Sequence, residues 1–154
     1  MADAADPGAW HAWFDGSAVP NPGRIGLGGL LQAPDGQRWT ISVACGTGNS
    51  NDAEYLALTV TLQQALALKP DALVVYGDSR IVIDDMLGSQ PPVAVLQVHR
   101  LRAQALVAQF PAIRLGWIPR AKNSVADALA RVSQISATGC SIPDLSIVIP
   151  SPSV

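Results

Sequence analysis

The sequence predicts an α/β domain with a five-stranded mixed sheet, in which three antiparallel strands are followed by parallel strands and helices cover both faces. The first three strand-like segments are separated only by short turns, as in an antiparallel meander. Beyond residue 50, helical and strand-like segments alternate, which is typical of parallel strands joined by helices. The 154 residues are 49% hydrophobic, enough for one domain with a sizeable core.

The meander is predicted from aromatic and apolar segments bounded by turn residues. Residues 9–15, AWHAWFD, form an aromatic strand, and the cluster GSAVPNPG follows it as a turn. Residues 24–33 and 37–45 are the second and third strands, joined by the tight turn PDG at 34–36. Consecutive strands with such short links are expected to pair antiparallel.

The second half of the sequence changes its periodicity. Residues 52–68 have helical spacing, with Leu58, Leu62, Ala65 and Leu66 near one face. Residues 72–78 are almost entirely apolar, which is typical of a strand buried on both faces. The remaining segments are expected to be helix, helix, strand and helix, at residues 79–87, 93–110, 112–118 and 123–135.

The domain is expected to span residues 9–136, between a short N-terminal extension at 1–8 and a Pro/Ser-rich tail at 137–154. The tail is expected to be loose, and an added edge strand formed by its alternating run LSIVI is the alternative. The N-terminus lacks the features of a signal peptide, and no apolar run reaches the roughly 18 residues that span a bilayer. A cytoplasmic protein is therefore expected, with Cys45 and Cys140 as free thiols and a single disulfide as the alternative.

Composition also constrains the partners. The net charge of −2 and the charged fraction of 14% provide no general attraction to nucleic acid. A polyanionic partner would therefore have to be held locally or through metal ions.

Four acidic residues lie at the ends of predicted strands or in the first turns of predicted helices. Asp15 and Asp78 each end an apolar strand, although Asp is depleted in strands. Glu54, the single glutamate of the chain, lies in the first turn of a helix, and Asp127 lies in the first turn of the last helix. Because functional groups of such sheets gather at the carboxyl ends of parallel strands, we expect these acids to meet at one edge.

Each of these acids also has a purely structural interpretation. Asn51 and Glu54 have the spacing of a capping box, and Asp78 or Ser79 could cap a helix. Asp127 would be favoured near a helix N-terminus by the helix dipole alone. Four such coincidences within one topology are less expected than one shared site.

Four clustered carboxylates raise one another's pKa values, and a hard divalent cation relieves this repulsion. Two such ions about 3.5–4 Å apart activate water and stabilise the leaving oxygen of a phosphodiester. This chemistry requires no nucleophilic side chain. Neither histidine is expected to be catalytic, since His11 is predicted to be a core residue and His99 a polar-face residue of a helix.

Four segments, FDGSAVPNPGRIGLGGLL, GNSNDAEYLAL, VVYGDSRIVI and WIPRAKNSVADALAR, resemble in order the motifs of the type 1 ribonuclease H family. The resemblance covers about residues 10 to 135 and implies a ribonuclease H-like fold. It implies Mg²⁺-dependent hydrolysis of the RNA strand of RNA–DNA hybrids, leaving 5′-phosphate and 3′-hydroxyl ends. It assigns the metal ligands to Asp15, Glu54, Asp78 and Asp127, with two Mg²⁺ ions when substrate is bound and Mn²⁺ as a substitute.

The resemblance also implies positions for substrate contacts. Asn21, Asn51 and Ser79 align with motif positions near the minor groove of the hybrid, where 2′-hydroxyls are recognised. The family often has Asn-Asn before the helical acid, whereas this chain has Ser50-Asn51. Neither a membrane nor an obligate protein partner is expected.

Two further departures concern basic residues. Many members carry a histidine in the loop before the last acid, whereas the short loop here, PRAKN, contains Arg120 and Lys122. It is similar to a subgroup with an arginine in this region, and Arg120 is expected to contact phosphate. The region corresponding to a basic protrusion offers only Arg100 and Arg102, with His99, so modest substrate affinity is expected.

Parts of the sequence also fit other functions. A module that binds RNA or hybrid without cleaving it, and a nuclease with a different nucleic-acid preference, both remain open. The segment FDGS is similar to the phosphate loop of actin-like ATPases, but those proteins need two such domains. The run GLGGLL at 26–31 lacks the third glycine of a dinucleotide-binding loop and is followed by strand signals.

Overall fold

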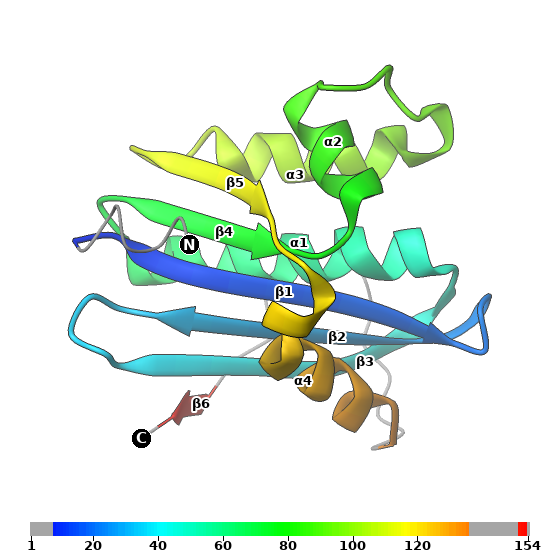
Figure 1. The fold of residues 1–154 in the computed structure, drawn as a ribbon, viewed down its shortest axis with the longest axis horizontal. Helices are drawn as coiled ribbons and strands as arrows, with labels where there is room; N and C mark the ends of the chain where they lie inside the picture. Colours follow the sequence, from blue (N-terminus) through cyan, green and yellow to red (C-terminus); the bar gives the residue numbers. More distant parts are fainter. Residues whose placement is uncertain (1–7, 136–150, 154) are drawn as a thin grey trace.

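The structure, a computed structural model, describes residues 8–135 and 151–153. Its main sheet has the order β5-β4-β1-β2-β3-β6, and Figure 1 shows the helices arranged around it. The strands are β1 (Trp10–Val19), β2 (Gly23–Gln32), β3 (Arg38–Gly48), β4 (Leu73–Gly77), β5 (Ile113–Trp117) and β6 (Ser151–Ser153). The helices are α1 (Ser50–Leu68), α2 (Arg80–Leu87), η2 (Ala94–Leu96), α3 (Gln97–Val107), η3 (Arg120–Lys122) and α4 (Ser124–Ile135).

The predicted mixed sheet is confirmed. β1, β2 and β3 pair antiparallel in sequence order, and β4 pairs parallel with both β1 and β5. β1 is longer than predicted, because it continues to Val19, well beyond Asp15. Its pairing with β4 nevertheless ends at Phe14 opposite Gly77, so beyond this point β1 is paired on its β2 side and no longer on its β4 side. This offset leaves room beside β1 for side chains from other elements.

Helix α1 is the central helix of the fold. The sequence indicated one apolar face, but all residues from Ala53 to Leu62 are buried, as is Ala65. A helix buried around its whole circumference needs neighbours on more than one side. The main core packs α1 between the sheet and the layer formed by α2 and α3. Figure 1 shows α1 behind the sheet and α4 in front of it.

The glycines of β2 allow helices to approach both faces of the sheet. A Cβ atom at Gly28 would lie 2.1 Å from the carbonyl oxygen of Ala126 in α4. At the neighbouring Gly29, which faces α1, a Cβ atom would lie 2.6 Å from the Thr61 hydroxyl. The run GLGGLL therefore belongs to a strand, as the strand signals after it indicated. Its glycines leave the space that the two helices need for their close approach.

A buried polar network joins α1, α2 and α3. The Tyr55 hydroxyl donates to Asp85 Oδ2, and Arg100 Nη1 contacts both Asp85 carboxylate oxygens at 3.0 Å. Arg100 also donates to the Val93 carbonyl at 3.2 Å. Arg100, one of the few basic residues that the sequence offered in the region of a basic protrusion, therefore has its guanidinium committed to the protein interior.

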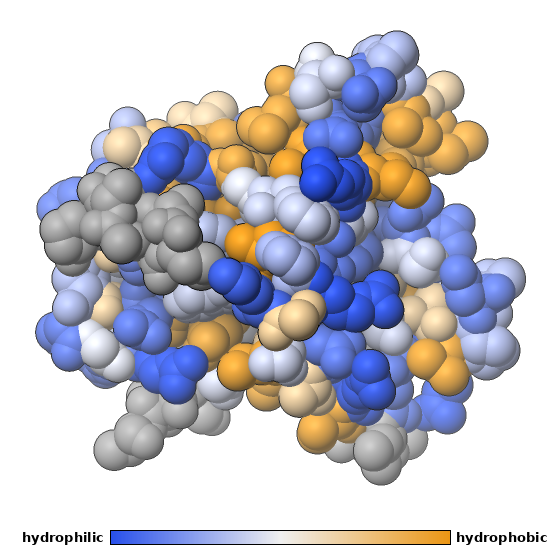
Figure 2. All heavy atoms as spheres, viewed as in Figure 1, coloured by the Kyte–Doolittle hydropathy of each residue, from blue (hydrophilic) through white to orange (hydrophobic). Residues whose placement is uncertain are grey.

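His99 also differs from its prediction as a polar-face residue. Its ring stacks on Tyr55 with ring centroids 5.7 Å apart, and Nε2 lies 3.0 Å from Asp52 Oδ1. The outer surface of this region is instead apolar, since Val95, Val98 and Leu101 are 87%, 70% and 54% exposed. Figure 2 shows hydrophobic residues gathered at this upper end of the molecule. Of the two arginines expected in this region, Arg100 is committed to the interior and Arg102 is half-buried in α3.

The structure describes only part of the segments that concern the tail and the cysteines. Ser151–Ser153 forms a short strand antiparallel to β3, so a loose conformation does not describe these three residues. An edge strand such as β3 presents unpaired backbone groups that a further segment can pair with. The run at 145–149 lies outside the described residues, as does Cys140. Cys45 is disulfide-bonded, so the expectation of a free thiol is wrong for this residue.

Among the helices described, none is both long and apolar enough to cross a lipid bilayer.

Candidate metal and nucleic-acid site

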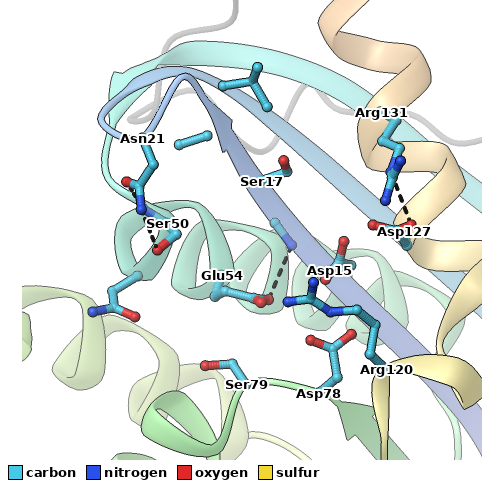
Figure 3. Close-up of a pocket in the computed structure, with 14 residues that line it drawn as sticks. Asp15, Ser17, Asn21, Ser50, Glu54, Asp78, Ser79, Arg120, Asp127 and Arg131 are labelled. Carbon is cyan, nitrogen blue, oxygen red and sulfur yellow. Dashed lines mark hydrogen bonds and ion pairs between the residues drawn. The ribbon is translucent and has the colours of Figure 1, made fainter.

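A cleft of about 530 Å³ opens at the edge of the sheet where β4 ends (Figure 3). It contains all eight residues for which the sequence predicted a role in metal or substrate binding. The lining residues are Asp15, Gly16, Ser17, Ala18, Val19, Asn21, Ser50, Asn51, Glu54, Asp78, Ser79, Arg120, Asp127 and Arg131. The predicted convergence of strand ends and helix starts is therefore observed.

Asp15 is carried by the part of β1 that extends past β4. It pairs with Gly28 of β2, the glycine that faces α4. The next residue, Gly16, faces α1, because a Cβ atom there would lie 2.0 Å from the Ala53 carbonyl oxygen. Successive side chains of a strand alternate between faces, so Asp15 points towards the α4 side. It reaches the cleft because no neighbouring strand covers this part of β1 on the β4 side.

Glu54 reaches the same point from α1. Its carboxylate accepts a hydrogen bond from the Gly16 backbone N–H, with 3.1 Å between Oε1 and the nitrogen. The capping box of α1 is formed by Asn49 and Asp52, so the proposed capping pair of Asn51 and Glu54 is wrong. Glu54 lies one turn deeper than a capping residue and is only 8% exposed. The structural explanation for a glutamate at this position is thereby removed.

Asp78 follows the last residue of β4 and is held by two neighbours. Asn123 Nδ2 donates to Asp78 Oδ2 at 2.8 Å. Trp117 Nε1 donates to the Asp78 backbone carbonyl at 3.0 Å. Asp78 does not cap α2, since the neighbouring Ser79 is the N-cap and accepts from the Val82 N–H at 3.3 Å.

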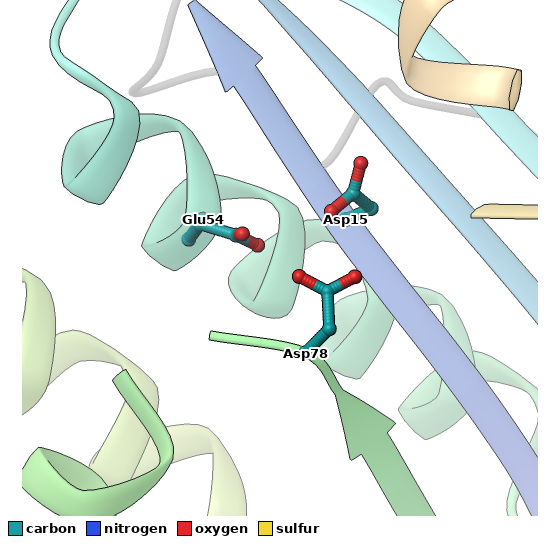
Figure 4. Close-up of side chains that lie close together, drawn as sticks. All are labelled: Asp15, Glu54 and Asp78. Atoms are coloured by element: carbon teal, nitrogen blue, oxygen red, sulfur yellow. The ribbon is translucent and has the colours of Figure 1, made fainter. Parts of the chain in front are cut away.

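Carboxylate oxygens of Asp15, Glu54 and Asp78 lie within 4.8 Å of one another, as Figure 4 illustrates. Three oxygen donors at this spacing suit a hard divalent cation such as Mg²⁺. Asp127 lies beside this group but outside it. Its Oδ2 atom forms an ion pair with Arg131 Nε at 3.0 Å in the same helix. The fourth predicted ligand therefore lines the cleft without joining the tight cluster.

The electrostatics of the acids follow from burial and crowding. Burial raises the pKa of Asp15 to about 8, and the charges of Asp78 and Asp127 act in the same direction. A hydrogen bond with Asp127 raises it further. Burial, followed by the charges of Asp15 and Asp78, also raises the pKa of Glu54 well above its usual value. Such carboxyl groups are poorly compensated by the protein itself, as expected of residues that bind a cation.

Arg120 provides the main opposing charge. It is exposed at the start of η3, and Figure 3 shows its guanidinium extending towards the acids. Its charge lowers the pKa of both Asp15 and Glu54, although burial outweighs this effect. Neither His11 nor His99 lines the cleft. Instead, His11 Nδ1 lies 3.1 Å from the Tyr76 hydroxyl.

The predicted substrate contacts all line the cleft, but two of them have structural partners. Asn21 Oδ1 accepts from the Ser50 N–H at 3.0 Å, and its Nδ2 donates to the Ser50 hydroxyl at 3.3 Å. These bonds join the β1–β2 turn to the start of α1. Ser79 caps α2, as described above. Whether these residues and Asn51 contact substrate remains a prediction.

Asn123 is a residue that the sequence analysis missed. It is 1% exposed and donates to both the Phe14 carbonyl and the Asp78 carboxylate. A local sequence pattern could not identify it, because both partners are distant along the chain. The only available signal was its position immediately before the helix that carries Asp127.

A family model described as reverse transcriptase-like matches residues 13–133. The bifunctional protein Rv2228c of Mycobacterium tuberculosis is 33% identical over 136 residues, which are 84% of this chain and 36% of that protein. The chain thus spans about a third of the length of this curated relative.

Solved structures agree with the sequence comparison. RNase H1 from Halobacterium salinarum superposes with a TM-score of 0.79 and 33% identity, covering 83% of this chain and 98% of that one. LC11-RNase H1, solved in complex with an RNA/DNA hybrid, has a TM-score of 0.76 and 25% identity, covering 83% and 98%. The residues that the family model matches, 13–133, include all four acids.

Proposed function

Because the chain belongs to the type 1 ribonuclease H family, we propose that it is a metal-dependent endoribonuclease acting on RNA–DNA hybrids. The observation that carries the proposal is the cluster of Asp15, Glu54 and Asp78, contributed by three different elements. Its donors are all oxygen atoms, and its buried carboxyl groups have raised pKa values. Mg²⁺ is the ion we propose, with Mn²⁺ as a substitute.

Two divalent ions at this site would supply Lewis-acid stabilisation of the phosphate and a lowered pKa for the attacking water. The protein's own contribution is to place the ligands. The Gly16 N–H donates a hydrogen bond to Glu54, and the Asn123 amide donates one to Asp78. Asp127, at the margin of the cluster, is proposed as the fourth ligand. Cleavage within the RNA strand would leave 5′-phosphate and 3′-hydroxyl ends.

The positive groups of the cleft are proposed to hold the substrate backbone. Arg120 extends over the acids, where a scissile phosphate would lie, and its planar fork suits phosphate oxygens. Asn21, Asn51 and Ser79 lie along the same cleft and are proposed to face the minor groove. The 2′-hydroxyls found there would distinguish RNA from DNA.

The decisive experiment is a cleavage assay with labelled RNA–DNA hybrid, RNA duplex and DNA duplex across a titration of Mg²⁺ and Mn²⁺. We expect metal-dependent cuts within the RNA strand of the hybrid only, and none with the Asp78→Asn variant. A shift of the hybrid in gels without cleavage at any metal concentration would identify a binding module instead. Preferential cleavage of RNA or DNA duplex would establish a nuclease of different specificity.

A further inference from the structure

Asn123 lies where three segments of the site meet. Its side chain is buried, and its Nδ2 atom donates to the Phe14 carbonyl at 2.9 Å and to Asp78 Oδ2 at 2.8 Å. Phe14 directly precedes Asp15 in β1, and Asp78 directly follows β4. The backbone carbonyl of Asn123 accepts from the Asp127 N–H at 3.1 Å in the first turn of α4. Asn123 thus forms hydrogen bonds with the Asp78 side chain, with the Asp127 backbone and with the residue that precedes Asp15.

The chemistry of these contacts requires an amide donor. The Asn123 side chain has two partners, the Phe14 backbone carbonyl and the Asp78 carboxylate, and both are acceptors. The two hydrogens of an NH₂ group match them. A carboxylate at this position would face two acceptors and add a further negative charge. The bond to Asp78 is charge-assisted, which makes it stronger than a bond between neutral groups.

The bond also opposes the repulsion within the cluster. Asp78 carries a carboxylate close to those of Asp15 and Glu54, and like charges at this separation favour a rotamer that moves one of them away. Asp78 lies just beyond the end of β4, where no further strand pairing holds it. The donor from Asn123 therefore opposes the outward movement of its side chain.

A purely structural role would be poorly served by this side chain. Within the described part of the chain, Asn123 Oδ1 is buried and has no hydrogen-bond partner. A buried acceptor without a partner destabilises the folded state. The Nδ2 group donates two hydrogen bonds, whereas the burial of Oδ1 without a partner costs stability. Such a cost is expected where a residue is retained for the site and not for the stability of the fold.

We propose that Asn123 is a positioning residue that holds the Asp78 carboxylate in place for metal binding. The inference rests on the proposed metal-dependent function. Asn123 does not contact the metal or the substrate in this scheme, and it acts through Asp78. Hydrogen-bond partners of metal ligands commonly change metal affinity by about 10–100-fold when they are removed.

The test is calorimetric titration of Mn²⁺ into the full chain without substrate. We expect Asn123→Ala to weaken Mn²⁺ binding about 10-fold or more. Ser133→Ala is the matched control, since it removes a buried hydrogen bond within α4, the helix that follows Asn123, to the Ala130 carbonyl at 2.6 Å, without touching the acids. It should lower thermal stability while leaving Mn²⁺ affinity unchanged. Wild-type affinity in Asn123→Ala would overturn the inference.

A double-mutant cycle separates this inference from the proposed function. If Asn123 acts through Asp78, the variant Asp78→Asn/Asn123→Ala should bind Mn²⁺ no more weakly than Asp78→Asn alone. An additional loss equal to that of Asn123→Ala alone would overturn the positioning role. Unchanged Mn²⁺ affinity in Asp78→Asn would instead refute the proposed metal site itself. Should Asn123→Ala fail to fold, Asn123→Ser takes its place in the same cycle.

Discussion

At the residue scale, the site depends on buried carboxyl groups, whose negative charge is poorly solvated by water. Asp15 and Glu54 are 6% and 8% exposed and lie beside Asp78. A carboxyl group whose pKa is higher in the folded state destabilises that state as pH rises from its unfolded to its folded pKa. For Asp15, this window extends from 3.8 to about 8. The acids that are proposed to bind metal are thus a source of instability in the metal-free protein.

Asp15→Asn should abolish cleavage and stabilise the metal-free protein at high pH. At pH 8 we expect its free energy of unfolding to exceed that of the wild type by about 1–3 kcal/mol, since one pKa unit corresponds to about 1.4 kcal/mol. The difference should shrink as pH falls towards 4, because the folded carboxyl group is then protonated and the unfolded one approaches its own pKa of 3.8. Unfolding in chelator from pH 4 to 8.5 measures it. Asp71→Asn, at an exposed position, is the control, and an equal gain in both variants would contradict the explanation.

Arg120→Ala should reduce turnover by about 1.5–3 kcal/mol in activation free energy, the value for a hydrogen bond to a charged group. Mn²⁺ binding should persist. Arg120→Lys should recover part of the loss, because it keeps the charge but not the planar fork. Wild-type kinetics in Arg120→Ala would show that the guanidinium has no role at the phosphate.

The pH profile of the wild type provides a separate test. No histidine lines the cleft. We therefore expect the rate to rise smoothly towards alkaline pH, without the inflection near pH 6.5 that a histidine would give. Steady-state rates across pH 5.5 to 9 would show such an inflection if a histidine took part.

At the element scale, close packing brings helices to the sheet edge. α4 lies against the glycines of β2, and α1 lies against Gly16 of β1. These contacts place Asp127 and Glu54 on opposite sides of the strand that carries Asp15. Backbone approach of this kind is possible only where no side chain intervenes.

Gly28→Ala should therefore damage both stability and activity. Its Cβ atom would lie 2.1 Å from the Ala126 carbonyl oxygen, so α4 must move. We expect a loss of about 3 kcal/mol or more in unfolding free energy, at the upper end for overpacking. Gly116→Ala is the matched control in β5, because nothing lies within 4 Å of a Cβ atom there. Equal stability of the two variants in urea unfolding would refute this packing argument.

The network of Tyr55, Asp85 and Arg100 should make the helical layer sensitive to acid. Burial by itself raises the pKa of Asp85, but hydrogen bonds from Tyr55, the Val93 N–H and Arg100, with the arginine charge, lower it overall. Its stabilising contribution is therefore present above the unfolded pKa and is lost as pH falls through the folded pKa.

Asp85→Asn should lower the unfolding free energy at pH 7 by about 3 kcal/mol, because it leaves Arg100 without its buried partner. The difference from wild type should diminish in acid. Urea unfolding at pH 7 and at acidic pH well below 3.8, the ordinary pKa of Asp85, tests this, with Asp84→Asn in the same helix as the control. A constant difference across this range would show that the charge of Asp85 is unimportant.

At the scale of the whole molecule, the charge distribution is unfavourable for binding a polyanion. The net charge is −2, Arg100 is committed to the interior, and the surface over α3 is apolar. The positive side chains that line the cleft are Arg120 and Arg131. Substrate affinity is therefore expected to depend on few phosphate contacts and on the bound cations.

Cleavage measured below substrate saturation should fall as salt increases from 50 to about 200 mM, because each phosphate contact releases counterions. The turnover number at saturating hybrid should change much less, which separates binding from chemistry. Arg131→Ala should reduce the slope of log rate against log salt by up to about 1, as one contact is lost. A flat rate across this range would contradict the predicted backbone contacts.

The sequence by itself determined the order of the main elements and the mixed sheet, and it predicted that four acids would meet at one edge of this sheet. These features are encoded locally, in apolar periodicity, in turn residues and in acids at strand ends and helix starts. The resemblance in four motifs then connected the acids to one chemistry. Prediction succeeded here because parallel strands bring their carboxyl ends to the same edge whatever the details of packing.

Only the tertiary structure decided which neighbours each side chain meets. It showed that Asn49 and Asp52, not Asn51 and Glu54, cap α1, and that Arg100 is an interior residue. It also placed Asn123 against Phe14 and Asp78, which are 109 and 45 residues away along the chain. Such contacts depend on how helices pack on the sheet, and a pattern that spans a few residues carries no information about partners so distant.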